Sequence, residues 1–228
     1  MSDTVYTVVR YLVDRLYWQG TLLGEAHLPT QGPAVFVANH LGPAGPIGVI
    51  CSIPLHFYTW IIADMLDRHQ AADYLRQDFI EPSLKLKPPL SPLVATALTR
   101  ITVPLLTSLG CIPVRRGDEH ELSLSLALLQ QGKLLLVFPE APELEMDPLT
   151  RMRPFLKGFT RLGEMYSAAC GERLRFYPVA VHISRRVQVG APLTIDPSAH
   201  PPAERLRLLH HLEATVKAMY LTLDASQP

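Results

Sequence analysis

The sequence predicts an α/β fold in which a mostly parallel sheet is flanked by helices, within a single domain spanning residues 1–228. Short segments rich in Val, Ile, Leu and Phe alternate with longer segments of helical periodicity, as in βαβ units. The runs at 34–38 and 134–138 are apolar throughout, which is typical of parallel strands that are buried on both faces. A chain of 228 residues is long enough to bury one core without disulfides.

Residues 1–20 are expected to form an N-terminal amphipathic helix, because apolar side chains recur at helical spacing at Val5, Val8, Leu12 and Leu16. Two interpretations are open. The helix either packs on the domain or lies in a membrane surface, with its apolar side chains in the acyl region. Trp18, at its end, is a residue type found at membrane interfaces.

The remaining elements alternate along the chain. Strands are expected at 21–28, 34–38, 56–62, 111–114, 134–138, 175–183 and 187–189, and helices at 47–52, 119–131, 155–170 and 202–223. Segment 64–109 is expected to be an expanded insertion: charged and helix-compatible over 64–78, irregular and Pro-rich over 79–92, and helical and apolar over 93–109. Pro104 would kink or divide the last of these helices.

Composition excludes several classes of function. The 21 basic residues balance the 21 acidic ones, so no net field favours nucleic acid. Three scattered cysteines, Cys51, Cys111 and Cys170, argue against a disulfide framework and a zinc site, and we expect reduced thiols in the cytoplasm. No uncharged stretch is long enough to cross a bilayer, and the first residues lack a basic leader. An interface with lipid is one explanation for the apolar fraction of 48%. We expect a cytoplasmic protein that lies peripherally on the cytoplasmic face of the membrane.

Four short blocks carry the candidate chemistry. In chain order they are Val37-Ala-Asn-His40, Gly110-Cys-Ile-Pro-Val-Arg-Arg116, Val137-Phe-Pro-Glu140 and Tyr177-Pro-Val-Ala-Val181. The first places a histidine at the end of a buried strand, where α/β folds position reactive groups. Imidazole titrates near neutral pH, which suits a side chain that takes up and releases protons. The ordered set, which covers about residues 21 to 195, resembles the 1-acylglycerol-3-phosphate acyltransferase (phospholipid/glycerol acyltransferase) family.

The resemblance implies acyl transfer from an acyl-CoA or acyl-carrier-protein thioester to a hydroxyl of a glycerolipid such as lysophosphatidic acid. This is a step of phospholipid biosynthesis, and its partners are lipids and not nucleic acids. His40 would be the catalytic base. Asn39, Arg115, Arg116 and Glu140 would form the substrate-binding set, in which Arg116 takes the place of a phosphate-binding arginine. No cofactor and no metal are implied, because the thioester is a co-substrate.

The first block departs from the family pattern, which has an aspartate five residues after the histidine. That position is Gly45, which has no side chain to orient an imidazole. In a Ser-His-Asp protease, exchanging the orienting Asp for Asn lowers turnover by about 10⁴. Asp64, Asp67, Glu140 or a backbone carbonyl could supply a substitute, and the sequence leaves these alternatives open.

The third block also departs from the pattern, because Ala141-Pro142-Glu143 replaces Gly-Thr-Arg and removes a cation. The acceptor's phosphate would then be held by Arg115 and Arg116, with help from Arg151, Arg153 or Lys157, or the acceptor is not a phosphomonoester. These departures leave two alternatives to an active acyltransferase. One is a catalytically impaired or inactive lipid-binding relative, and the other is a thioesterase in which water replaces the alcohol.

Overall fold

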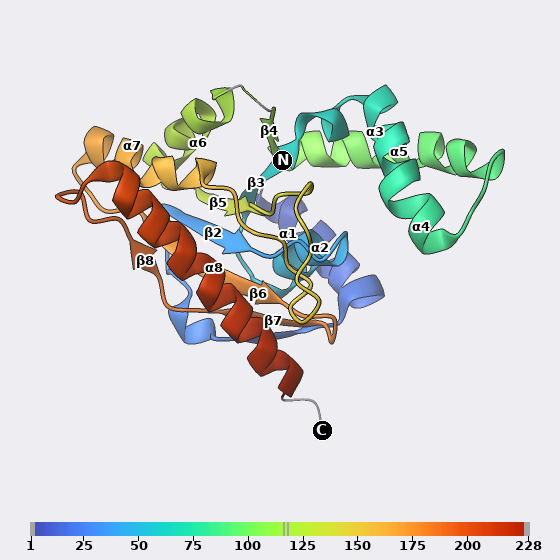
Figure 1. The fold of residues 1–228 in the computed structure, drawn as a ribbon. Helices are drawn as coiled ribbons and strands as arrows, with labels where there is room; N and C mark the ends of the chain where they lie inside the picture. Colours follow the sequence, from blue (N-terminus) through green and yellow to red (C-terminus); the bar gives the residue numbers. More distant parts are fainter. Residues whose placement is uncertain (1–2, 116, 118, 226–228) are drawn as a thin grey trace. The chain divides into compact units, whose positions relative to one another are not determined.

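The computed structural model of the protein describes residues 3–115, 117 and 119–225 (Figure 1). The chain divides into two compact units. Tyr58–Glu121 forms one, called here the inserted unit, and the segments on either side of it form the other, the main unit. The predicted insertion at 64–109 falls within the inserted unit. The single domain expected over residues 1–228 stays a prediction.

The sheet of the main unit confirms the predicted mostly parallel α/β arrangement. Its strands lie in the order β1 (Thr21–Leu23), β7 (Arg186–Val189), β6 (Arg175–Val181), β2 (Ala34–Ala38) and β5 (Leu134–Val137), and β8 (Leu193–Thr194) also pairs with β6. β2 runs parallel to both β5 and β6, and β1 runs parallel to β7. β7 and β8 pair with β6 in the antiparallel sense. Every residue of β2 and β5 is buried, as their unbroken apolar sequences predict.

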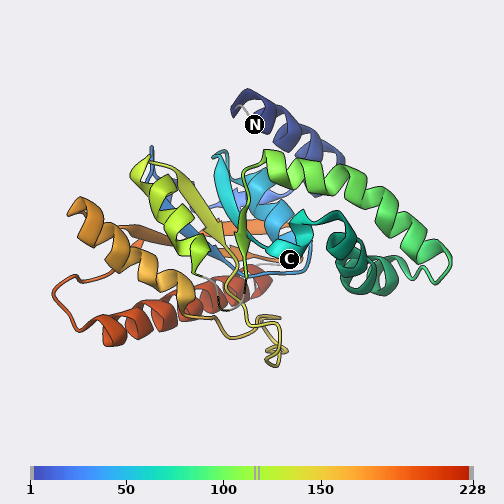
Figure 2. The same ribbon diagram turned by 90° about the horizontal axis from the view of Figure 1, so that it is seen from above.

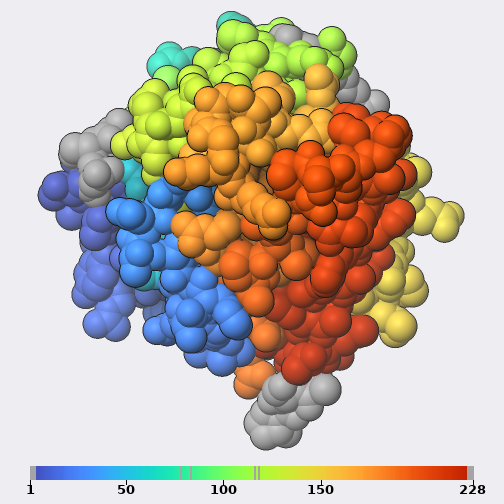
Figure 3. Space-filling view, turned by 90° about the vertical axis from the view of Figure 1, so that its left-hand side faces the viewer, coloured from blue at the N-terminus to red at the C-terminus, as the bar shows by residue number. Residues whose placement is uncertain are grey.

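Helices cover both faces of this sheet. α2 (Ala44–Ser52) packs on β6 and β7, and α8 (Pro201–Ala225) packs on β6 from the opposite side, as Figures 1 and 2 show. α7 (Arg161–Cys170) lies beside α8, where Arg205 and Glu164 form an ion pair at 3.1 Å; the two helices meet in the orange and red part of Figure 3.

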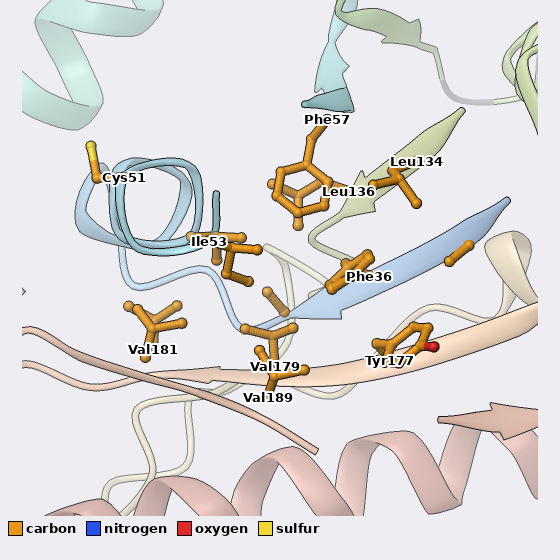
Figure 4. Close-up of a cluster of buried hydrophobic side chains, with 14 of the residues drawn as sticks. Phe36, Cys51, Ile53, Phe57, Leu134, Leu136, Tyr177, Val179, Val181 and Val189 are labelled. Atoms are coloured by element: carbon orange, nitrogen blue, oxygen red, sulfur yellow. The ribbon is translucent and has the colours of Figure 1, made fainter. Parts of the chain in front are cut away.

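The core of the main unit lies between α2 and the sheet (Figure 4). Phe36 of β2 stacks on Tyr177 of β6 and meets Phe57 edge-on, with both pairs of ring centroids 4.9 Å apart. All three rings are nearly or fully inaccessible to solvent. Truncating such a buried ring to alanine typically costs about 3–5 kcal/mol, so this cluster holds β2 rigidly in place.

The N-terminal segment forms α1 (Asp3–Val13), followed by a π-helical turn, Asp14–Trp18, against α2. Tyr6 is buried and stacks on His56 at 4.1 Å. Trp18 is also buried, and its indole N–H donates to Ser52 Oγ at 2.8 Å. Trp18 therefore does not support the membrane-surface interpretation of this helix, because its ring belongs to the core.

The inserted unit contains a parallel pair of strands, β3 (Phe57–Ile62) and β4 (Ile112–Val114). Between them are a 3₁₀ turn (Ala63–Leu66), α3 (Arg68–Leu75), a π-helical turn (Arg76–Ile80), α4 (Glu81–Leu84) and α5 (Leu90–Ser108). The irregular segment expected at 79–92 is thus largely helical. Pro104 lies inside α5 without dividing it, because a proline removes only one backbone hydrogen bond from an otherwise intact helix.

α5 has its larger apolar side chains on the outside. The residues that it buries are Ser91, Ala95, Thr99 and Val103, whereas Leu93 and Ile101 are 66% and 68% exposed. Within residues 3–115, 117 and 119–225, α5 is the one helix that is long and apolar enough to cross a membrane, by length and composition.

Three further boundaries differ from the sequence-based expectation. β1 ends at Leu23, because Gly24 turns the chain with φ of +76° where Val189 O leaves no room for a side chain. The helix expected from 155 begins at Arg161, since Phe155 forms a β-bridge with Glu140 and a 3₁₀ turn follows. The two-residue strand β8 was not predicted. α6 (His120–Gln130) and α8 match the expected helices closely.

Candidate functional site

Asn39 and His40 follow directly after β2, the central strand of the main unit. The Asn39 side chain is fully buried and uses both ends of its amide on one residue of β6. Its Nδ2 donates to Val181 O at 3.0 Å, and Val181 N donates to its Oδ1 at 2.7 Å. The amide thus extends the pairing of β2 with β6 by one residue. Because the side chain is fully buried and bonded to β6 at both ends, we assign Asn39 a structural role; its predicted substrate contact stays a prediction.

His40 is solvent-exposed at the end of this strand. Its ring meets Phe138 edge-on, with centroids 5.4 Å apart and an interplanar angle of 84°. Although His40 keeps a solvent-exposed surface, the protein packed around its ring removes part of the ring's hydration and so lowers the pKa of His40; a hydrogen bond to its own backbone opposes this shift, and the charge of Arg153 lowers the pKa further. The imidazole is therefore neutral near pH 7, the form that accepts a proton.

Glu140 links the histidine loop to a second loop. His40 N donates to Glu140 Oε1 at 2.7 Å, and Arg153 N donates to Glu140 Oε2 at 2.9 Å. Burial raises the pKa of Glu140, against the opposing effect of these two hydrogen bonds and of the Arg153 charge. The carboxylate bonds to the backbone of His40 and makes no bond to its ring, so Glu140 does not orient the imidazole directly. It is a positioning residue.

The second loop spans residues 138–157 and returns on itself at its base. Leu156 N donates to Pro139 O at 2.7 Å, and Ala141 N donates to Pro154 O at 3.0 Å. From α8, Glu213 accepts from Phe155 N at 3.0 Å while it pairs with Lys217 at 2.7 Å. The carboxylates of Glu140, which follows β5, and of Glu213, in α8, thus hold the backbone of the segment that carries Arg153.

Position 45 lies beside the backbone of His40. Gly45 is in the first turn of α2, and a Cβ built there would lie 3.0 Å from Asn39 O and 3.3 Å from His40 Cα. Within the part of the chain that the structure describes, no carboxylate hydrogen-bonds the imidazole of His40. The main unit therefore places position 45 beside the backbone of His40 and puts no acid there.

The other candidates lie in the inserted unit or outside the described residues. Arg115 is exposed directly after β4. Arg116 falls outside the described residues, so the paired-arginine site stays a prediction. Asp67 does not act as a free acid, because it caps α3 by accepting from His69 N at 2.9 Å and Gln70 N at 3.1 Å. Asp64 belongs to the 3₁₀ turn before it.

Two residues of the site were hard to find in the sequence. The sequence offered Arg153 as one of three alternatives and gave no indication of Glu213. Both contacts involve a backbone N–H group, that of Arg153 with Glu140 and that of Phe155 with Glu213, and such contacts leave no pattern in the sequence. A shallow hollow of about 250 Å³ lies between α7 and the start of α8, lined by Glu164, Ile195 and Pro201. We do not place the reaction there, since none of the residues lining it is a histidine.

The comparisons with known proteins do not add a family. No protein-family model matches the chain, and no curated protein matches it. No cluster of three or more His, Cys, Asp or Glu side chains suited to a metal ion occurs in residues 3–115, 117 and 119–225. Proposals about function therefore rest on the four sequence blocks and on the geometry around His40.

Proposed function

We propose that the protein is an O-acyltransferase that moves a fatty acyl group from an acyl-CoA or acyl-carrier-protein thioester to a hydroxyl of a glycerolipid. The observation that carries this proposal is the exposed, neutral His40 at the end of β2, held through its backbone by Glu140. A solvent-accessible base on a rigid strand end is what direct hydroxyl activation requires.

The proposed reaction has one chemical step on the enzyme. His40 takes the proton from the acceptor hydroxyl as its oxygen attacks the thioester carbonyl carbon. A C–O bond forms, the C–S bond breaks, and the leaving thiolate receives the proton from the imidazolium. The products are the lipid ester and the free thiol, so neither a covalent acyl-enzyme nor an oxidant is needed. Without an acid on its ring, His40 is expected to work more slowly than a His–Asp pair.

Exposed apolar faces support peripheral contact with a lipid surface. On α1 and the turn that follows it, Val5, Val8 and Leu12 are about half exposed and Leu16 is 83% exposed. In the inserted unit, α5 turns Leu93 outward. Amphipathic helices of this kind bind the interface between headgroups and acyl chains. A lipid substrate would meet the enzyme at such a surface, on the cytoplasmic face of the membrane.

A specific observation favours a second candidate, a non-catalytic lipid-binding protein. No carboxylate reaches the ring of His40 among the residues described, and Gly45 leaves its place empty. A relative that had lost catalysis would keep the fold and the apolar faces but not the acid. The two candidates differ in a single measurable property, the turnover of a thioester.

The test is transfer of a labelled acyl group by purified protein to lysophosphatidic acid in vesicles, beside His40→Ala and His40→Gln. Since His40 is exposed, neither change should unfold the protein. Acylated lipid that depends on the thioester and falls at least about 100-fold in both variants supports the acyltransferase. Equal traces of product in all three proteins, with vesicle binding retained, would identify the lipid-binding relative. Free fatty acid without acylated lipid would point to thioester hydrolysis.

A further inference from the structure

A second histidine of the main unit, His182, is buried between a serine and an aspartate. It follows β6 directly, in the hairpin that joins β6 to β7, and its side chain is fully inaccessible to solvent. Its Nδ1 lies 2.7 Å from Ser184 Oγ, and its Nε2 lies 3.4 Å from Asp224 Oδ1. Ser184 and Asp224 are both exposed, so the buried ring connects two groups at the surface.

The hydrogen bonds of the hairpin fix which nitrogen of His182 carries the proton. The backbone N–H of Ser184 donates to Nδ1 at 3.2 Å, and because an N–H group can only donate, Nδ1 is the accepting nitrogen. The Ser184 hydroxyl therefore also donates to Nδ1, and the proton of the neutral ring lies on Nε2, which faces Asp224. Burial lowers the pKa of His182, against the opposing effect of Asp224, so the ring is neutral near pH 7.

Contacts around His182 hold the ring in this position. Tyr220 of α8 meets the ring edge-on, with centroids 4.6 Å apart. His182 N donates to Arg186 O at 2.9 Å, and Arg186 Nη1 donates to Leu223 O at 3.4 Å. The second of these bonds ties the hairpin to the last turn of α8, directly before Asp224 (Figure 1). A nucleophile, a base and an orienting acid are thus placed in sequence by fixed elements.

We propose that Ser184, His182 and Asp224 form a second reactive site, at which the Ser184 hydroxyl is acylated by thioesters and activated esters. His182 Nδ1 takes the hydroxyl proton as Ser184 Oγ attacks the carbonyl carbon of the donor. A C–O bond to Ser184 forms, the bond from the acyl carbon to the leaving sulfur or oxygen breaks, and the leaving group receives the proton from His182. Asp224 is a positioning residue that stabilises the imidazolium through Nε2. Water then hydrolyses the acyl-serine to the free acid.

This site does not depend on the acyl transfer proposed for His40, because none of its three residues takes part in that reaction. His182 follows β6 as His40 follows β2, and the two strands are parallel neighbours. Both histidines therefore lie at the same edge of the sheet, where α/β folds position reactive groups. Exposure of Ser184 lets a donor as large as an acyl-CoA reach the hydroxyl.

The experiment treats the purified protein with p-nitrophenyl acetate and, separately, with octanoyl-CoA. Acylated serines are quantified by mass spectrometry of peptides, and release of p-nitrophenolate detects turnover where the acyl-serine hydrolyses quickly. Ser198 is the matched control within the same protein, because it is exposed and its hydroxyl donates to Asp196 Oδ1 at 2.7 Å in place of a histidine. The variants are Ser184→Ala, Asp224→Asn and Asp224→Glu, all at exposed positions whose substitution should leave the fold intact.

Ser184 is expected to react at least about 100-fold faster than Ser198, the gain that a positioned base supplies. Ser184→Ala should remove this reaction. Asp224→Asn should slow it by about tenfold, less than the loss of about 10⁴ in a protease triad, because Asp224 is exposed. Asp224→Glu, which keeps the charge, should retain more of the rate. If His182 and Ser184 only close the hairpin turn, Ser184 will react no faster than Ser198, and Ser184→Ala will release p-nitrophenolate as fast as the wild type. That result, or an unchanged rate in Asp224→Asn, overturns the inference.

Discussion

Gly45→Asp should rebuild the acid that His40 lacks. A Cβ at position 45 would lie 3.3 Å from His40 Cα, so a carboxylate there would lie within reach of the imidazole. Two opposite charges about 5 Å apart attract by about 3 kcal/mol at an effective dielectric constant of about 20. Because His40 is exposed, solvent screening reduces this energy, and we expect about 1.4 kcal/mol, or a rise of about one unit in the pKa of His40.

The fold should tolerate this substitution. Replacing a helical glycine gains up to about 1 kcal/mol, and an acid in the first turn of α2 gains about 0.3–1 kcal/mol from the helix dipole. The close contact of the new Cβ with Asn39 O, at 3.0 Å, offsets part of this gain. Stability is therefore expected to change by less than about 1 kcal/mol.

The assay is NMR titration of the His40 ring in Gly45→Asp, with Gly45→Ala as the control for the added Cβ. Acyl transfer by the same proteins is then compared, and Gly45→Asp is expected to be at least about tenfold faster. If the two variants titrate at the same pH, position 45 does not face the ring, and the resemblance to a degenerate His–Asp motif is mistaken.

Three further predictions follow from the contacts described. Glu140→Gln should lower the free energy of unfolding by about 2–3 kcal/mol in urea denaturation, because the new amide NH₂ would face one of the two backbone N–H groups that the carboxylate now accepts from. The control Glu145→Gln, at an exposed position, should change it by less than about 0.5 kcal/mol. Burial lowers the pKa of His182 below 6.5, so the folded state binds fewer protons than the unfolded chain and stability should fall as pH drops from about 6.5 towards that lowered pKa; a slope unchanged in His182→Asn would contradict this. Leu93→Glu should weaken co-sedimentation with phospholipid vesicles more than Thr96→Glu, which adds the same charge to the same helix but replaces no apolar side chain. Equal binding by both variants would show that α5 does not contact the vesicle.

The sequence predicted those parts of the fold that depend on burial. The apolar runs that became β2 and β5 were correctly placed, since only a strand buried on both faces needs such a run. Local turn chemistry was harder to predict. The early end of β1 follows from Val189 O, which lies against Gly24, and the late start of α7 follows from the bridge of Phe155 to Glu140. Both depend on contacts between residues far apart in the chain.

The candidate site shows the same division. His40 could be located because a histidine after a buried strand is a local signal. The role of Glu140 could not be predicted, because its two partners are backbone N–H groups that any residue type would supply. The two hydrogen bonds between the Asn39 amide and the backbone of Val181 were not predicted for the same reason.

The hydrogen bonds that Asn39 and Glu140 make around His40 all end on main-chain atoms. Asn39 bonds to main-chain atoms of Val181 in β6, and Glu140 bonds to the main-chain N–H groups of His40 and Arg153, so these hydrogen bonds do not depend on the side chains of their partners. The Val181 side chain still has a packing role, because it is buried in the core. Exposed side chains around His40 can therefore be exchanged one at a time while the hydrogen bonds that position its backbone stay in place.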